Sequence, residues 1–270
     1  MVELFAQNEK TIERQSSKGN QLKWENNGTW YKADFTGYEG LSEYVISQLL
    51  KKSSLSEEEF VVYEPEQIKY RTNIYNGVKS SSFLQEGWQI ITLERLFKSF
   101  FGESLNKAVY SIDEHTDRLK LIVEQVERIT GLKDFGIYMS KLFTIDAFFL
   151  NEDRHTHNIA VLMNGDGMFA YCPIFDNGAA LLADTTMDYP LGEDVQDLMK
   201  NVHAKTICTS FDEQLDIAEK LYGTNLSFKF TKNDISNLLD SATEYSDEVR
   251  ERVRMILYAQ MRKYSYLFAN

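Results

Sequence analysis

One apolar segment constrains the fold of this chain more than any other feature. Residues 136–150, GIYMSKLFTIDAFFL, are apolar on nearly every side of a helix, which is typical of a helix through the centre of a folded lobe. Asp146 lies within this segment, and a carboxyl group at that depth needs a hydrogen-bonding partner or water. We therefore expect a lobe that is built around one buried helix.

A β-hairpin is predicted shortly after this helix. The sequence IAVLM-NGDG-MFAYCPIF has two apolar segments around a glycine-containing turn, which we centre on residues 165–166. That register puts Asn158 roughly opposite Pro173, and it puts Asp176 about three residues, or about 10 Å, farther along the strand. Asp153, Asn158 and Asp176 are therefore expected to converge at one end of the hairpin.

The residue types at these three positions indicate phosphoryl transfer. Kinase-type sites use an Asp, four intervening residues, an Asn, and a second Asp beyond a hairpin. Asp153 would orient the substrate hydroxyl and accept its proton, while Asn158 and Asp176 would give oxygen ligands to a Mg²⁺ ion on the phosphates of ATP. Any one of these residues alone is typical of a turn or a helix cap, but the combination favours a site.

A second hairpin is predicted near the N-terminus, within residues 20–36. Asn27 and Gly28 join two short segments rich in Trp, Tyr and Phe, which is a strong signal for a two-residue turn. Lys18 and Gly19 open this hairpin, where backbone NH groups and a cation would cover the triphosphate. The glycine-rich pattern of ordinary protein kinases is missing here.

Lys32 on this hairpin is the predicted phosphate anchor. Residues 41–52 follow it with the apolar spacing of a helix that carries Glu43. We expect Lys32 to reach the phosphates while Glu43 holds it, with Glu39 as the alternative partner. The alternative interpretation is that Lys32 is an exposed strand lysine and that Glu43 lies on a solvated helix face.

Composition changes near residue 88. Before it the chain is β-rich with one helix, and residues 60–65 are expected to form a strand. After it, helices are predicted at 92–101, 117–131, 136–150, behind a capping box of Thr231 and Asp234, and at 247–267. We therefore predict an α+β, two-lobed chain, with an N-lobe at 1–88 and a C-lobe at 89–270.

Charge and cysteine usage narrow the functional classes. Lys and Arg total 29 against 41 Asp and Glu, so the net charge of −12 gives no basis for broad attraction to nucleic acid. No segment has the apolar length of a membrane span or a signal peptide, so we expect a cytoplasmic protein without a membrane partner. Cys172 and Cys208 lie in unrelated contexts, which predicts free thiols rather than a disulfide or a thiolate zinc site.

Five segments, SSKGNQLKW, YKADF, LSEYVISQLL, EDRHTHN and IFDNGAAL, resemble in this order the kinase core of the HipA family. The resemblance covers roughly residues 14–260. It implies a two-lobed serine/threonine-protein kinase, related in fold to the phosphoinositide kinases, that binds ATP and Mg²⁺ between its lobes. Several members of the family are toxins that phosphorylate aminoacyl-tRNA synthetases or other cytoplasmic proteins.

The resemblance also implies roles for single residues. By position, they are the catalytic base Asp153, the Mg²⁺ ligands Asn158 and Asp176, the ATP-binding Lys32, and a phosphate-loop pattern at Gly19, Gln21 and Lys23. A serine just before that pattern can be autophosphorylated in the family, which makes Ser16 and Ser17 candidates. A phosphate there would repel the phosphates of ATP and disorder the loop.

Partners are less well defined by the resemblance. Full-length HipA proteins carry an additional N-terminal subdomain that helps contact a DNA-binding antitoxin, whereas this chain begins almost at the phosphate loop. Either the protein is a stand-alone kinase, or a separate small protein supplies the subdomain. The acidic residues 182–197 are the expected activation or substrate-binding segment, and they favour a basic surface on a protein substrate with a Ser or Thr acceptor.

Three other functions compete with this prediction. A pseudokinase would hold nucleotide or a partner without turnover, which the complete Asp, Asn, Asp and Lys set argues against. A lipid or small-molecule kinase could use the same scaffold, but no basic membrane-facing patch supports a lipid substrate. Zinc at Asp153, His155 and His157 is disfavoured because alternating residues point apart on a strand, so His155 is expected to brace the catalytic loop instead.

Overall fold

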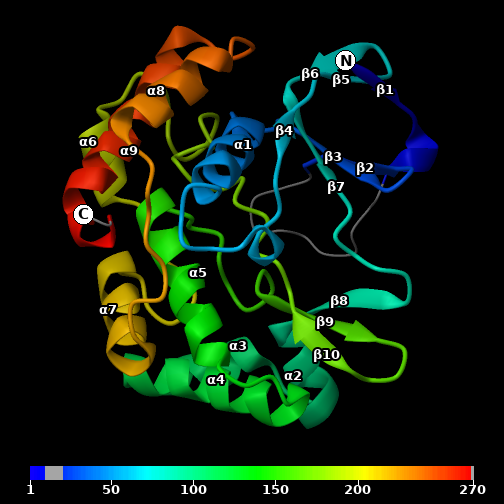
Figure 1. The fold of residues 1–270 in the computed structure, drawn as a ribbon, viewed down its shortest axis with the longest axis vertical. Helices are drawn as coiled ribbons and strands as arrows, with labels where there is room; N and C mark the ends of the chain where they lie inside the picture. The colour runs from blue at the N-terminus through cyan, green and yellow to red at the C-terminus, as the bar shows by residue number, and fades with distance from the viewer. Residues whose placement is uncertain (10–20, 269–270) are drawn as a thin grey trace. The chain divides into compact units, whose positions relative to one another are not determined.

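A computed structural model describes residues 1–9 and 21–268 (Figure 1). The chain divides into two compact units. The first unit contains Met1–Phe83, Phe175–Val202 and Ser227–Asn270, and the second contains Leu84–Ile174 and His203–Leu226. The first crossover between the units, after Phe83, lies close to the predicted boundary at residue 88. The assignment of 1–88 and 89–270 as lobes stays a prediction, because the first unit also takes in two later segments.

A four-stranded antiparallel sheet forms the centre of the N-terminal part of the first unit. Its strand order is β2-β3-β7-β4, with β2 at Lys23–Asn26, β3 at Thr29–Ala33, β7 at Gly77–Ser81 and β4 at Glu64–Pro65. Asn27 and Gly28 join β2 to β3 with φ angles of 50° and 78°, as a tight turn of the primed type requires. The predicted N-terminal hairpin is therefore confirmed.

The strand expected at residues 60–65 is wrong for most of its length. Only its last two residues pair as β4, and a short 3-10 helix, η2 at Glu57–Glu59, precedes it. The backbone of Tyr63 is occupied by side chains instead: its NH donates to Ser47 Oγ at 3.0 Å, and its carbonyl accepts from Gln48 Nε2 at 2.9 Å. These side-chain partners replace the ladder that a strand would need.

Helix α1, at Glu39–Leu50, packs on β3, β4 and β7. It begins and ends two residues earlier than predicted, and its buried side includes Leu41, Val45 and Leu49. Two glycines allow this close approach, since a Cβ on Gly40 would lie 2.9 Å from the Cα atom of Gly77. The helix is thereby held against the strand that neighbours β3.

A small second sheet completes this part of the first unit. Parallel pairing joins β1 (Val2–Leu4) to β5 (Ile68–Tyr70), and β6 (Asn73–Tyr75) pairs antiparallel to β5. A 3-10 helix, η1 at Ala6–Asn8, follows β1. Side chains of this sheet pack with the buried Trp24 of β2, so the two sheets share one apolar cluster.

The later segments of the first unit are helical. They form α6 (Val195–Lys200), α8 (Lys232–Ser241), α9 (Asp247–Lys263) and the 3-10 helix η3 (Ser265–Leu267), with α9 packed against α6 and α8. The predicted capping box is confirmed, because Thr231 accepts from the NH of Asp234 and Asp234 accepts from the NH of Thr231. The final helix ends at Lys263, four residues earlier than predicted.

The second unit is built around the buried helix that its sequence predicts. Helix α5, at Phe135–Phe149, is buried along nearly its whole length and packs against α4 (His115–Thr130) and α7 (Phe211–Tyr222) (Figure 1). Helices α2 (Leu93–Phe101) and α3 (Leu105–Tyr110) pack beside α4. Among the helices of residues 1–9 and 21–268, none is long and apolar enough to cross a membrane.

A three-stranded sheet of order β10-β9-β8 lies in the same unit, with β8 at Trp88–Thr92, β9 at Ala160–Asn164 and β10 at Phe169–Tyr171. The predicted hairpin is present, but its register differs by one residue, since Met163 pairs with Phe169. Asn164 and Met168 close a three-residue loop in which Gly167 has a φ of 76°. If this register is continued to the start of the hairpin, Asn158 lies opposite Ile174 rather than Pro173.

Candidate active site

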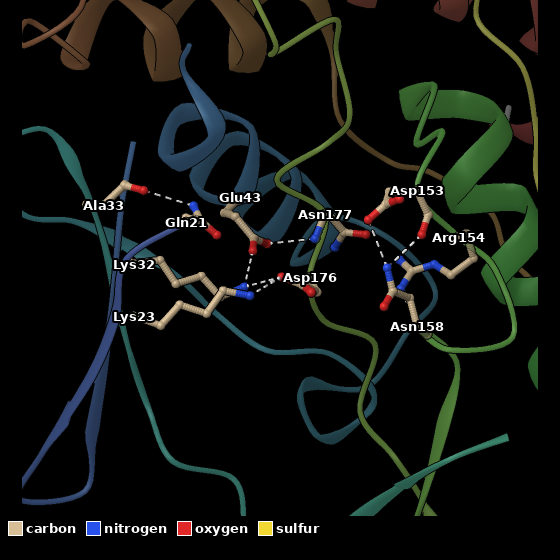
Figure 2. Close-up of polar contacts among 10 residues, drawn as sticks. All are labelled: Gln21, Lys23, Lys32, Ala33, Glu43, Asp153, Arg154, Asn158, Asp176 and Asn177. Atoms are coloured by element: carbon tan, nitrogen blue, oxygen red, sulfur yellow. Dashed lines mark hydrogen bonds and ion pairs between the residues drawn. The ribbon is translucent and has the colours of Figure 1, made fainter. Parts of the chain in front are cut away.

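Lys32 lies at the centre of a buried ion-pair cluster in the first unit. Its side chain is on β3 and the residue is only 8% exposed. Its Nζ contacts the carboxylate of Glu43 from α1, and it lies 2.6 Å from Oδ1 of Asp176 (Figure 2). The expected contact between Lys32 and Glu43 is confirmed, and the reading of an exposed strand lysine is wrong.

Glu43 joins this lysine to the segment that follows Asp176. The residue is 1% exposed, so a solvated helix face is excluded, and its second oxygen accepts from the NH of Asn177 at 2.9 Å. Glu39 is occupied elsewhere, because it accepts the backbone NH groups of Thr36 at 2.8 Å and of Phe35 at 3.1 Å. The alternative pairing of Lys32 with Glu39 is therefore wrong.

Asp176 contacts both lysines of the N-terminal hairpin and has an unusual backbone conformation. Lys23 on β2 is directly opposite Lys32 on β3, and like charges in this position repel. The carboxylate of Asp176 offsets this repulsion, because its Oδ1 also lies 3.5 Å from Lys23 Nζ. Its φ of 62° is left-handed, which for a residue other than glycine costs about 1–3 kcal/mol and is typical of functional sites.

The charge of Lys32 is fixed by its surroundings. Burial acts to lower the pKa of Lys32, but the carboxylates of Asp176 and Glu43 outweigh it and raise the pKa well above its ordinary value. The ring of Tyr63, 5.0 Å from Nζ, adds a further favourable contact. Lys32 therefore stays cationic across the physiological range, as a phosphate anchor must.

The predicted phosphate loop is described only in part. Gln21 donates from Nε2 to the carbonyl of Ala33 at 3.0 Å, which ties the end of the loop to β3 (Figure 2). Ser16, Ser17, Lys18 and Gly19 lie outside the described residues. Their roles in phosphate binding and autophosphorylation stay predictions.

Asp153 and Asn158 lie together in a loop of the second unit. Nδ2 of Asn158 donates to the carbonyl of Asp153 at 2.8 Å and to its Oδ2 at 2.9 Å (Figure 2). His155 Nε2 lies 3.6 Å from Oδ1 of Asp153, which is too long for the hydrogen bond expected to brace the loop, so that bracing stays a prediction. Burial lowers the pKa of His155, although Asp153 opposes the shift, so its imidazole favours the neutral form.

The two histidines of this loop do not point apart. Residues 155–158 form turns rather than a strand, and the rings of His155 and His157 lie edge to face with centroids 5.5 Å apart. The expected alternation of these residues on a strand is therefore wrong, because the chain turns here and the backbone NH of His157 donates to Nδ1 of His155 at 3.3 Å.

Arg154 is the residue that sequence reasoning missed. It is buried, and its Nε lies 3.2 Å from both carboxylate oxygens of Asp146 on α5. Its Nη1 donates to the carbonyl of Asn158 at 3.2 Å (Figure 2 shows both residues). Asn151 Nδ2 also donates to Asp146, at 3.0 Å, so the partners expected for this carboxylate are found. An Asp within an apolar helix, followed shortly by an Arg, was the signal that could have predicted the pair.

Helix α2 supports the same loop from its N-terminus. The NH of Glu94 donates to the carbonyl of Thr156 at 3.1 Å, and the NH of Leu93 donates to the carbonyl of Ile159 at 2.8 Å. Thr156 Oγ1 in turn donates to Glu94 Oε2 at 3.2 Å. The second half of the loop is therefore fixed to the start of α2, which suits a residue that must present a carboxylate in one orientation.

The predicted residues thus form two groups. Lys23, Lys32, Glu43 and Asp176 contact one another in the first unit, and Asp153 contacts Asn158 in the second. Convergence of all three predicted Asp and Asn residues stays a prediction, because Asp176 and the other two belong to different units. The carboxylate of Asp176 and the amide oxygen of the half-buried Asn158 are hard donors, which fit Mg²⁺ by their chemistry.

The fold is similar to that of a solved kinase. The chain matches the crystal structure of CtkA, a proinflammatory kinase from Helicobacter pylori, with a TM-score of 0.54. The match covers 91% of this chain and 88% of CtkA, and the two sequences are 18% identical. No family model matches the chain, and no curated protein matches it. The likeness shows an α+β, two-lobed, kinase-like fold, so the predicted fold class is confirmed. Assignment to the HipA family stays a prediction.

Proposed function

We propose that this protein is an ATP- and Mg²⁺-dependent serine/threonine-protein kinase of the HipA type. The observation that carries the proposal is the buried cluster in which Lys32 contacts both Glu43 and Asp176. A purely structural cluster has no need of two lysines directly opposite each other on neighbouring strands, since this arrangement is repulsive. The kinase-like fold and the Asp153–Asn158 loop support the same function.

In this proposal, each group of residues has one task. Lys32 binds the phosphates of ATP, and Glu43 keeps its ammonium group in place. Asp176 and Asn158 hold Mg²⁺, which neutralises charge on the phosphates when it is bound. When Mg²⁺ binds, the carboxylate of Asp176 would give up part of its contact with the two lysines. Lys23 would then be able to bind the phosphates of ATP instead.

Asp153 acts on the second substrate. Its carboxylate orients a Ser or Thr hydroxyl and accepts its proton as the hydroxyl oxygen bonds to the γ-phosphorus. The bond from that phosphorus to the β–γ bridging oxygen breaks, and ADP leaves with the electron pair. Asn158 and Arg154 keep Asp153 in position through the loop, so most of the rate enhancement comes from orientation and charge neutralisation.

The finer parts of the proposal rest on the sequence. A protein substrate with a basic surface is supported by the acidic segment at 182–197, whose Asp184 is buried and whose Asp188 is exposed. Autophosphorylation at Ser16 or Ser17, a toxin role in the cytoplasm, and pairing with an antitoxin or a separate small partner are extensions that rest on the resemblance to HipA proteins.

The proposal is tested with purified protein, Mg²⁺ and γ-labelled ATP, alone and with a cell lysate, followed by phosphosite mapping. We expect label on Ser16, Ser17 or a lysate protein, and no label with an Asp153→Ala variant of intact fold. ATP binding without labelled protein would contradict protein kinase activity and favour the pseudokinase. Transfer to liposomes or to a small-molecule panel would favour the lipid or small-molecule kinase instead.

A further inference from the structure

A cluster of nitrogen, sulfur and oxygen donors lies in the second unit, outside the candidate active site. His115 is the first residue of α4, Glu213 is in the first turn of α7, and Cys208 lies in the loop before α7. One donor atom from each of these residues lies within 4.8 Å of the other two. Nδ1 of His115 and Oε1 of Glu213 are only 2.6 Å apart.

We propose that His115, Cys208 and Glu213 bind a zinc ion. Imidazole, thiolate and carboxylate are the three donors that zinc combines in proteins, and three protein ligands leave a fourth position for water. Hard cations such as Mg²⁺ and Ca²⁺ would be disfavoured by the sulfur and the imidazole.

The spacing of the donors suits such an ion. Tetrahedral zinc bonds of about 2.1 Å separate neighbouring donor atoms by about 3.4 Å. The contact between His115 and Glu213 would therefore open by less than about 1 Å, and the most distant pair of the cluster would close by about 1.4 Å at most. Rotation about side-chain bonds covers both changes without a shift of either helix.

Charge balance and access also support the site. The thiolate of Cys208 and the carboxylate of Glu213 together neutralise a divalent ion, so no net charge is placed against the positive N-terminal ends of α4 and α7. Arg118 is a cation near Cys208 and would repel a bound metal ion. Its guanidinium group is held by hydrogen bonds to the carbonyls of Ile112 and Ile207, both at 2.7 Å. The side chains of His115 and Glu213 are 34% and 49% exposed, so an ion can reach the buried thiol from solvent.

Binding would join three segments that the chain brings together only by folding. It would link the starts of α4 and α7 to the loop that contains Cys208. Two residues before this cysteine, Thr206 donates from Oγ1 to the carbonyl of Arg154 at 2.5 Å, within the loop that holds Asp153. The sequence predicted no thiolate zinc site because His115 is far from Cys208 and Glu213 in the chain and only one of the three ligands is a cysteine.

The alternative is an ordinary ion pair of His115 with Glu213 beside a protonated thiol that donates to the carbonyl of Ser210 at 3.3 Å. Titration of the chelator-treated full chain with Co²⁺ separates the two, because a cobalt–thiolate bond gives its own charge-transfer absorption. We expect that absorption, displacement of Co²⁺ by Zn²⁺, and one zinc ion per chain by elemental analysis.

Matched variants decide the assignment. Cys208→Ser should remove the thiolate absorption, and His115→Ala should weaken Zn²⁺ binding by about 100-fold or more, since even outer-shell changes cost 10–100-fold. Cys172→Ser, at the other buried thiol, and His203→Ala, at an exposed histidine, should leave both unchanged. Should Cys208→Ser fail to fold, Glu213→Gln at its half-exposed position should still weaken Zn²⁺ binding relative to the controls. Wild-type protein without the thiolate absorption, or ligand variants that bind as tightly as the controls, would overturn the proposal.

Discussion

The cluster around Lys32 and the loop around Asp153 are constructed in opposite ways. Lys32, Glu43 and Asp176 come from three distant segments and are joined by ion pairs. Asp153 and Asn158 belong to one short loop and are joined by hydrogen bonds. The buried pair of Arg154 and Asp146 anchors this loop to α5. The first group depends on the tertiary structure of its unit, whereas the second depends on one anchored loop.

This difference separates the effects of mutation. Lys32 and Glu43 are buried, whereas Asp176 is partly exposed and also lies near Lys23, so removal of Lys32 leaves mainly the carboxylate of Glu43 without its cation in a low-dielectric environment. The side chain of Asp153 sits at the edge of its network and its removal leaves the anchoring pair intact. Changes in the loop tip should therefore affect chemistry more than stability, and changes in the cluster should affect both.

The largest effect is expected for Asp153→Ala. Loss of the group that orients the hydroxyl and takes its proton should reduce phosphoryl transfer by about 10³-fold or more, while the fold survives. Rates of label transfer and a thermal unfolding curve measure the two effects. A variant with a sharply lowered unfolding temperature would show that Asp153 is part of the structural support instead.

Lys32→Met should be the most destabilising change in the first unit. It leaves Glu43 and Asp176 without their buried cation, which should lower the free energy of unfolding by about 3–5 kcal/mol. The matched control is Lys52→Met, because the Lys52–Asp234 pair has the same 2.6 Å separation with side chains 53% and 23% exposed. That exposed pair should cost at most about 1 kcal/mol. Equal losses in urea unfolding for the two variants would contradict a buried, compensated cluster.

Arg154→Met tests the anchor of the loop. Asp146 would keep its hydrogen bond from Asn151 but lose the guanidinium group, with an expected loss of about 3 kcal/mol. The double variant Asp146→Asn with Arg154→Met removes both charges and should recover part of this loss. Chemical denaturation of both variants gives the comparison, and a double variant less stable than the single one would rule out charge burial as the cause.

The last prediction is a pH dependence of stability from Asp34, next to β3. Its carboxyl group accepts from the NH of Gly40 at 2.5 Å and from the hydroxyl of Tyr245 at 2.9 Å. Burial raises the pKa of Asp34 to about 8; the bond from Gly40 opposes the shift and nearby Glu39 adds to it.

Because the folded state then holds a proton that the unfolded chain releases above about pH 4, stability should fall as the pH rises from 4 to 8 and level off above that. In Asp34→Asn a neutral amide takes the place of the carboxyl group: its oxygen can accept from the NH of Gly40, and its NH₂ group can donate to the hydroxyl oxygen of Tyr245. The variant should be more stable than the wild type at pH 8 and nearly equal at pH 4. Parallel pH profiles for the two proteins in unfolding experiments would exclude this assignment.

Local patterns were sufficient for much of the fold. Asn27 and Gly28 predicted their turn because its left-handed backbone suits few residues, and the all-round apolar composition of α5 predicted its burial. Helices α3 and α6 were missed because six residues are too few to show a period. Helix α7 was missed although Ser210 caps it and accepts from the NH of Glu213, as a capping signal predicts.

The candidate site was predictable to a similar degree. The Asp153–Asn158 spacing is local, and the contact of Lys32 with Glu43 follows from a strand and a helix in succession. The hairpin register was off by one residue because Gly167 makes the turn longer than the two residues assumed. The bond between Arg154 and Asp146 depends on how the loop returns to α5, which no sequence period records.

The central claim is that Asp153 serves the chemistry while the Lys32 cluster serves nucleotide binding. It is tested most directly by measuring Mg·ATP affinity and label transfer on the same preparations of the wild type and Asp153→Ala. We predict that both proteins bind Mg·ATP with similar affinity and that only the wild type transfers phosphate. A wild type that binds no Mg·ATP, or an Asp153→Ala variant that transfers phosphate at the wild-type rate, would contradict the account.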